Sequence, residues 1–272
     1  MFVDDDRIRS LGHVMAWARR QSITDLHLIV ERDAGALAAR ADQFTDPPTV
    51  LWLRGTELHP ASPEPPSLPD QPTSSPELSE LLVDSGLDVV VEHGYLAGER
   101  RGLEVARITD GRLEVGVGEA DRELTAMVHA GLSPEDALRR VIAIVDDKRR
   151  PGEPRHPLNQ LVPERWLRWS IRNDPSLVGL DRIEAAPPAR ARRGMRERDI
   201  AVARGDGAVV VFSVGIDLDL VPAAAEARAA LDPRARLVLV VPERDDHPVT
   251  HALAARLRDP ADIVTVAGDW RS

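Results

Sequence analysis

The chain has 272 residues, of which 43% are hydrophobic and 29% are charged, as is usual for a globular protein with a sizeable core. It contains no cysteine, which excludes disulfides, thiolate zinc sites, iron–sulfur clusters and cysteine nucleophiles. No apolar run approaches the roughly 20 residues that span a bilayer, and the acidic start is unlike a secretory signal. We therefore expect a cytoplasmic protein without a membrane partner.

The net charge of −10 argues against indiscriminate nucleic-acid binding, but the charge is unevenly distributed. Residues 1–159 hold 28 acidic and 18 basic side chains, whereas residues 160–272 hold 17 of each. Lys148 is the only lysine, so the basic side chains are nearly all arginine. This bias, together with many Ala, Val and Pro residues, indicates an actinobacterial-type, GC-rich genome more than selection for phosphate binding.

The first 59 residues predict a β-α-β segment. Helical spacing of apolar residues indicates helices, and β-branched runs indicate strands. The expected elements are a helix at 7–20, a strand at 25–31, an alanine-rich helix at 34–44 and a strand at 49–53. Such a unit implies parallel strands joined by a right-handed crossover.

Residues 60–77 contain seven prolines and few large apolar groups, which is typical of an exposed linker or loop. Residues 78–150 then complete the expected N-terminal domain with hairpin strands and helices. The predicted elements are a helix at 77–84, strands at 87–92, 103–108 and 113–117, and helices at 119–130 and 134–145. The Asp110-Gly111 step is a strong hairpin signal, and Ser133-Pro134 is a helix-start signal.

A charged, proline-bearing stretch at 146–157 precedes a C-terminal domain expected at 160–272. Residues 185–198 look irregular, and Gly205-Asp206-Gly207 marks a hairpin. The expected elements are helices at 163–173, 223–231 and 249–257, and strands at 199–203, 208–212, 237–241 and 263–266. The fold class is therefore α/β, with helices flanking a mixed sheet.

The two ends of the chain echo each other. Residues 26–53 and 237–266 share the order strand, alanine-rich helix, strand, and Leu-Ala-Ala-Arg occurs at 37–40 and at 253–256. The hairpin and helix at 103–130 similarly mirror those at 199–231. Two related α/β halves, the first in permuted order, would explain both echoes, and chance in an Ala/Arg-rich chain would also explain the matching letters.

The C-terminal region resembles the PD-(D/E)xK nuclease-like fold, specifically the catalytic domain of NucS-type mismatch endonucleases. The resemblance covers about 110 residues and is carried by short motifs. These are Pro163-Glu164-Arg165-Trp166-Leu167, Asn173-Asp174-Pro175-Ser176-Leu177-Val178-Gly179, Arg198-Asp199-Ile200-Ala201-Val202-Ala203 and the hairpin into 208–215. The resemblance implies that Glu164 is the helix acid and Asp199 the strand acid of a site that binds Mg²⁺ or Mn²⁺ and hydrolyses a phosphodiester.

The chain departs from this family at its most specific motif. Where the family has Glu-x-Lys or Glu-x-Gln, this chain has Ser213 and Gly215. A migrated acidic pair, Asp217 and Asp219, would restore carboxylates near Asp199 if the strand continued through residue 220. The alternative is that these two acids lie in a loop and cap the following helix.

Other candidate sites have simpler structural interpretations. Val115-Gly116-Val117-Gly118 lacks the third glycine of a dinucleotide turn, and Phe212-Ser213-Val214-Gly215 lacks the first glycine of a nucleophile elbow. His247 and His251 are spaced for a shared metal, but Pro248 favours a capping role for His247. Trp166 and Trp169 suit core and rim packing, with base stacking as the alternative. An arginine cluster suits phosphate-backbone binding or a solvated loop: Arg190, Arg192, Arg193, Arg196 and Arg198.

These observations predict a non-catalytic binding protein on a nuclease-like fold, with nucleic acid or a protein as partner and no cofactor. The first alternative is an active Mg²⁺- or Mn²⁺-dependent nuclease that uses Glu164, Asp199 and either Asp217 or Asp219. The second alternative is a structural or assembly protein whose alanine-rich helices form a homodimer. Which metal ligands and which substrate apply is left open by the sequence.

Overall fold

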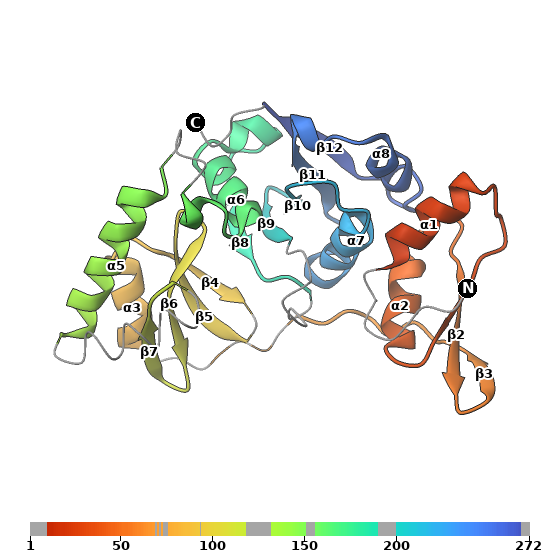
Figure 1. The fold of residues 1–272 in the computed structure, drawn as a ribbon, viewed down its shortest axis with the longest axis horizontal. Helices are drawn as coiled ribbons and strands as arrows, with labels where there is room; N and C mark the ends of the chain where they lie inside the picture. Colours follow the sequence, from red (N-terminus) through yellow and green to blue (C-terminus); the bar gives the residue numbers. More distant parts are fainter. Residues whose placement is uncertain are drawn as a thin grey trace.

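The structure is a computed structural model that describes residues 10–68, 70, 72, 76–92, 94–117, 132–150, 156–189 and 200–267. It is an α/β fold with three sheets arranged along the long axis of the molecule (Figure 1). A helix-backed antiparallel sheet lies at one end, the C-terminal sheet lies in the middle, and the N-terminal segment lies at the other end. None of the helices in the described ranges is long and apolar enough to cross a membrane.

The N-terminal segment forms the predicted β-α-β unit with one additional strand. Its elements are α1 (Leu11–Arg20), β1 (His27–Val30), α2 (Ala34–Ala41), β2 (Thr49–Arg54) and β3 (Glu57–Pro60). β1 and β2 are parallel, as predicted, and β3 returns antiparallel to β2. The sequence analysis missed β3, which is exposed along its whole length and therefore lacks the alternating apolar pattern of a half-buried strand.

The middle of the chain forms an antiparallel four-stranded sheet with helices on it. Its elements are α3 (Pro76–Asp84), β4 (Asp88–Glu92), β5 (Tyr95–Arg100), β6 (Leu103–Thr109), β7 (Arg112–Val115) and α5 (Pro134–Lys148). The Asp110-Gly111 hairpin is confirmed, because both residues have positive φ. The Ser133 cap is also confirmed, since its side chain accepts a hydrogen bond from the Asp136 nitrogen at 3.1 Å. The helix expected at 119–130 lies outside the described residues.

The C-terminal region contains the mixed sheet. Its elements are α6 (Pro163–Asn173), β8 (Glu184–Ala186), β9 (Ala201–Gly205), β10 (Ala208–Phe212), α7 (Leu220–Leu231), β11 (Arg236–Pro242), α8 (Pro248–Ala254) and β12 (Asp262–Val266). The strand order is β12-β11-β10-β9-β8, in which β8, β9 and β10 are antiparallel and β10, β11 and β12 are parallel. The predicted mixed sheet is confirmed, and the sequence analysis missed the three-residue strand β8.

Both faces of this sheet are buried, which explains why β10 is apolar at every position. Val209 and Val211 point into a cluster shared with α1, α2, α7 and α8. Val210 and Phe212 point into a second cluster beneath α6. A third cluster joins α3 and α5 to the antiparallel sheet. Residues 10–60 and 76–150 thus contribute to different clusters, while the boundaries of the domains remain a prediction.

A buried ion-pair group connects the antiparallel sheet to α6. Glu99, which is 2% exposed, accepts hydrogen bonds from Arg168 at 2.8 Å and from Arg165 at 3.3 Å. Burial opposes ionisation of Glu99, but the two guanidinium groups outweigh it and lower the pKa of this carboxyl. The backbone at Gly102 also approaches α6 closely, because a Cβ there would lie 2.3 Å from the Arg165 oxygen.

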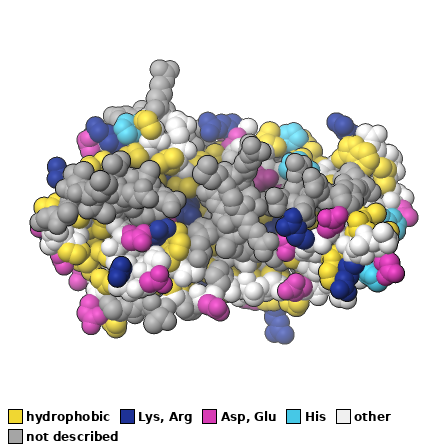
Figure 2. All heavy atoms as spheres, turned by 60° about the horizontal axis from the view of Figure 1, so that its bottom comes forward, with side chains coloured by type: hydrophobic (Ala, Val, Ile, Leu, Met, Phe, Trp, Pro, Cys, Tyr) yellow, Lys and Arg dark blue, Asp and Glu magenta, His cyan; other side chains and the backbone are white. Residues whose placement is uncertain are grey.

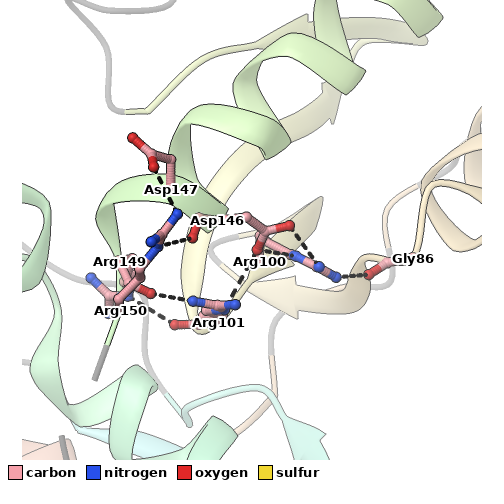
Figure 3. A network of polar contacts seen from close by, with 7 residues as sticks. All are labelled: Gly86, Arg100, Arg101, Asp146, Asp147, Arg149 and Arg150. Atoms are coloured by element: carbon pink, nitrogen blue, oxygen red, sulfur yellow. Dashed lines mark hydrogen bonds and ion pairs between the residues drawn. The ribbon is translucent and has the colours of Figure 1, made fainter. Parts of the chain in front are cut away.

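Arg149 ties the end of α5 to the same helix. Its guanidinium is fully buried 4.5 Å from the centre of the Trp166 ring and donates to the carbonyl oxygen of Arg101 at 2.9 Å. Figure 3 shows this arginine beside the Arg100–Asp146 pair, which has two hydrogen bonds of 2.8 and 2.7 Å. Trp166 is therefore a packing residue, and it is 1% exposed.

Candidate functional site

Four of the residues singled out in the sequence, Ser213, Gly215, Asp217 and Asp219, follow β10 where it ends beside β11. In parallel sheets, the loops beyond the carboxyl ends of the strands are the usual location of a binding site. The loop at 213–219 follows β10, and the short turn η4 (Glu243–Asp245) follows β11. Ser213 is 2% exposed, and its backbone nitrogen donates to the Val240 oxygen at 3.1 Å. This hydrogen bond continues the pairing between the two strands one residue beyond β10.

Gly215 has a backbone conformation that favours glycine. Its φ is +84°, in the left-handed region that favours glycine over residues with a Cβ. Its backbone nitrogen donates to Asp245 at 2.7 Å, and Asp245 has a side chain that is 13% exposed. Asp245 therefore holds the loop after β10 in place from the end of β11.

Asp217 and Asp219 lie in a turn. β10 ends at Phe212, so the strand does not continue to residue 220 and does not place these acids on one strand face. Asp217 accepts a hydrogen bond from the Asp219 nitrogen at 2.9 Å. Asp219 occupies the N-cap position of α7, yet its side chain makes no capping hydrogen bond there.

Asp219 instead binds the first helix of the chain. Its Oδ1 accepts a hydrogen bond from the Gly12 nitrogen at 2.7 Å, and its Oδ2 lies 3.6 Å from the His13 Nδ1 atom. The helix approaches so closely that a Cβ on Gly12 would lie 1.8 Å from the Leu218 oxygen. Asp219 is 2% exposed, so this carboxylate is part of a buried contact between α1 and the start of α7.

The remaining predicted acids are placed only in part. Glu164 lies in the first turn of α6 and is 7% exposed. Asp199 and the cluster Arg190, Arg192, Arg193, Arg196 and Arg198 lie outside the described residues. Convergence of the four acids therefore remains a prediction. Within the described ranges, the structure contains no group of three or more His, Asp or Glu residues that could hold a metal ion.

The histidine pair has two separate structural roles. His247 is the N-cap of α8, and its ring accepts a hydrogen bond from the Val249 nitrogen at 3.2 Å, which confirms the capping prediction. His251 lies 2.6 Å from Asp246, which is partly exposed. The two rings are therefore used in the local structure of the turn and the helix.

An open hollow of about 390 Å³ lies at the other end of β10, around the hairpin to β9. Asp206 accepts hydrogen bonds from the backbone nitrogens of Asp181 and Arg182 at 2.8 and 3.0 Å, and these lower its pKa. Its lining includes both basic and acidic side chains: Arg182, Glu184, Arg204, Asp206 and Asp232. This mixture gives the hollow no single charge preference, and the sequence analysis did not identify it.

Basic and acidic side chains are also mixed elsewhere on the surface. On the face drawn in Figure 2, the arginine and lysine side chains of the described residues are interspersed with acidic ones.

Comparison of the chain with protein-family models, with curated proteins and with solved structures finds no match in any of the three.

Proposed function

We propose that the protein is a non-catalytic binding protein built on a nuclease-like core, with nucleic acid as the first partner to test. The observation that carries the proposal is the set of hydrogen bonds that the carboxylates beyond β10 and β11 make to the backbone. Asp217, Asp219 and Asp245 each accept a hydrogen bond from a backbone nitrogen. Together with Ser213 and Gly215 at the two motif positions, these contacts favour a structural role for the acids.

The strand order supports the nuclease-like part of the proposal. The resemblance implies an antiparallel hairpin whose first strand brings an acid beside the end of the second strand. Ala201 pairs with Phe212, so the chain entering β9 runs beside the chain leaving β10. The family keeps its site at the equivalent end of its second strand, so this pairing supports the proposal.

Nucleic acid is favoured over a protein partner because of the arginine cluster at 190–198. Guanidinium groups bind phosphates and release counterions, which makes binding weaken with salt. The test is fluorescence anisotropy of labelled single- and double-stranded DNA and RNA at low and high salt. We expect Arg192→Ala/Arg193→Ala to weaken binding and the matched pair Arg139→Ala/Arg140→Ala on α5 to leave it unchanged. An equal loss of binding in both double variants, or no binding of the wild type at low salt, would contradict the proposal.

An active nuclease is the second candidate, and the position of β9 beside the end of β10 is the observation that favours it. In this candidate, Asp199 and one of the acids of the 213–219 loop would hold the metal ion. Calorimetric titration with Mn²⁺ and a cleavage assay on DNA and RNA separate the two candidates. Metal-dependent cleavage that Asp199→Ala abolishes would replace the binding proposal, whereas absence of metal binding at millimolar Mn²⁺ counts against the nuclease.

The homodimer alternative depended on exposed alanine-rich helices. In the structure, the alanines of α2 and the first four alanines of α7 (Ala223, Ala224, Ala225 and Ala227) are buried within the chain, where these two helices pack against each other. An assembly role through those alanine faces therefore needs the helices to separate first.

A further inference from the structure

The N-terminal unit repeats the architecture of the last part of the chain. The order α1-β1-α2-β2 matches α7-β11-α8-β12, with parallel strands in both. His27 pairs with Thr49 and Val238 pairs with Asp262, so the register also matches when β11 is placed 211 positions after β1 and β12 is placed 213 positions after β2. In each unit the second helix ends eight positions before the second strand begins, at Ala41 and at Ala254.

The two units meet at an antiparallel bridge between Phe44 and Leu257, which are 0% and 1% exposed. The Thr45 nitrogen donates to the Arg256 oxygen at 2.9 Å, and the Arg258 nitrogen donates to the Gln43 oxygen at 2.9 Å. Each of the three residues 43–45 has its equivalent 213 positions later, at 256–258. The two hydrogen bonds are therefore related by a local two-fold axis through the bridge, as at an interface between two identical subunits.

Burial follows this equivalence too, with an offset of 211 positions for the residues before α2 and 213 positions from α2 onward. Leu28 and Val30 of β1 correspond to Leu239 and Val241 of β11, and all four point into one shared cluster. α2 packs on α7, and α1 packs on α8, which are the two symmetric contacts of a two-fold pair. The repeated letters Leu-Ala-Ala-Arg are three residues out of step with this equivalence, so the structure and not the letters establishes it.

One buried ion pair breaks the symmetry. Arg40 of α2 donates to Glu226 of α7 at 2.8 Å from Nε, and both side chains are 4% exposed. The equivalent positions on the other side of the axis are Leu253 of α8 and Met15 of α1, each 1% exposed. If two C-terminal units met face to face, Leu253 would take the place of Arg40 beside Glu226, and a buried carboxylate against an apolar side chain is unfavourable. The ion pair therefore makes the α7–α8 face specific for the N-terminal unit.

We infer that α7 and α8 form a docking surface for the N-terminal unit (residues 11–54), of the kind found between subunits. In the monomer the same chain supplies this unit, and when two chains exchange their N-terminal units, a second copy supplies it. The connection after the unit suits such an exchange. Ala61 and Glu64 still bond to Val50 and Gly35, so the first residues of the connection belong to the unit. The next helix, α3, lies at the opposite end of the molecule from the N-terminal unit (Figure 1). Exchange of this kind joins two copies without any new type of contact.

The experiment uses two full-length variants, Arg40→Glu and Glu226→Arg. Each variant alone places like charges against each other in the buried interface. In an exchanged heterodimer, one interface regains the native Arg40–Glu226 pair and the other carries the reversed pair. We expect the two differently tagged chains, when co-expressed, to copurify through both tags as a species with twice the mass of one chain.

The double variant Arg40→Glu/Glu226→Arg is the control, because it restores a pair within one chain and is expected to remain monomeric. A milder second pair, Arg40→Leu and Glu226→Leu, guards against misfolding, since in the heterodimer it gives one native ion pair and one apolar pair. Failure of both co-expressed pairs to copurify, with the double variant folded by circular dichroism, would overturn the inference. Copurification of two wild-type chains to the same extent would also contradict it, because the charge pattern would then not direct exchange.

Discussion

Asp219 accepts a hydrogen bond from the backbone nitrogen of Gly12, which lies 207 positions earlier in the chain. This single contact ties the first helix to the turn where the nuclease resemblance would need metal ligands. A buried carboxylate that satisfies a buried helix N–H group is difficult to release for chemistry, because the N–H would be left without a partner.

We expect Asp219→Ala to lower the free energy of unfolding by about 1.5–3 kcal/mol, because it removes a charge-assisted hydrogen bond and leaves the Gly12 N–H buried. Asp219→Asn keeps an acceptor oxygen and should cost less than half as much. Urea titration followed by circular dichroism measures both variants. Equal losses for Ala and Asn would show that the hydrogen bond to Gly12 is not the source of the effect.

Gly12→Ala should be destabilising although alanine is the better helix former. The gain in helix propensity is about 1 kcal/mol, whereas a Cβ would lie 1.8 Å from the Leu218 oxygen and force α1 away from the turn. We expect a net loss of about 2 kcal/mol in thermal or urea unfolding. The control is Ala16→Gly in the same helix, which has only the propensity cost of about 1 kcal/mol. A stabilised Gly12→Ala variant would disprove the close approach.

Truncation of Phe44 and Leu257, which form the bridge between the two units, should also destabilise the protein. Phe44→Ala is expected to cost about 3–5 kcal/mol and Leu257→Ala about 2–5 kcal/mol, since both side chains are buried at the axis. The double variant should lose less stability than the sum of the two single losses, because the two residues share one interface. Leu58→Ala, at a position that is 49% exposed, is the control and should change stability by less than about 0.5 kcal/mol. Strict additivity would argue against a common interface.

Acid should destabilise the protein through Glu99. The folded-state pKa of Glu99 lies below its ordinary value of 4.5, so its ionised form contributes stability above that pH and the contribution is lost as the pH falls. We expect the wild type to lose stability steeply below about pH 4.5. The Glu99→Gln variant should be less stable than the wild type at neutral pH, and its stability should change less below pH 4.5. Breaking the pair with Arg165 and Arg168 should cost roughly 3–5 kcal/mol at pH 7. Parallel pH profiles of the two proteins, measured by thermal unfolding, would contradict this assignment.

Local signals in the sequence were sufficient for most helices and strands. Ser133-Pro134 starts α5, Asp110-Gly111 turns the β6–β7 hairpin, and the apolar run at 208–212 is a strand buried on both faces. Strands β3, β5 and β8 were not predicted because they lack such local signals. β3 is wholly exposed and β8 has only three residues, while β5 carries Glu99 and Arg100, whose burial depends on distant partners.

The sequence by itself determined the α/β class and the mixed C-terminal sheet, because periodicity and residue identity are local properties. Only the tertiary structure decided that Asp219 binds Gly12, that Glu99 lies between two arginines and that Arg40 meets Glu226 beside a two-fold bridge. These contacts join residues from 66 to 207 positions apart. Their partners are chosen by the packing of whole helices against one another, which no short stretch of sequence specifies.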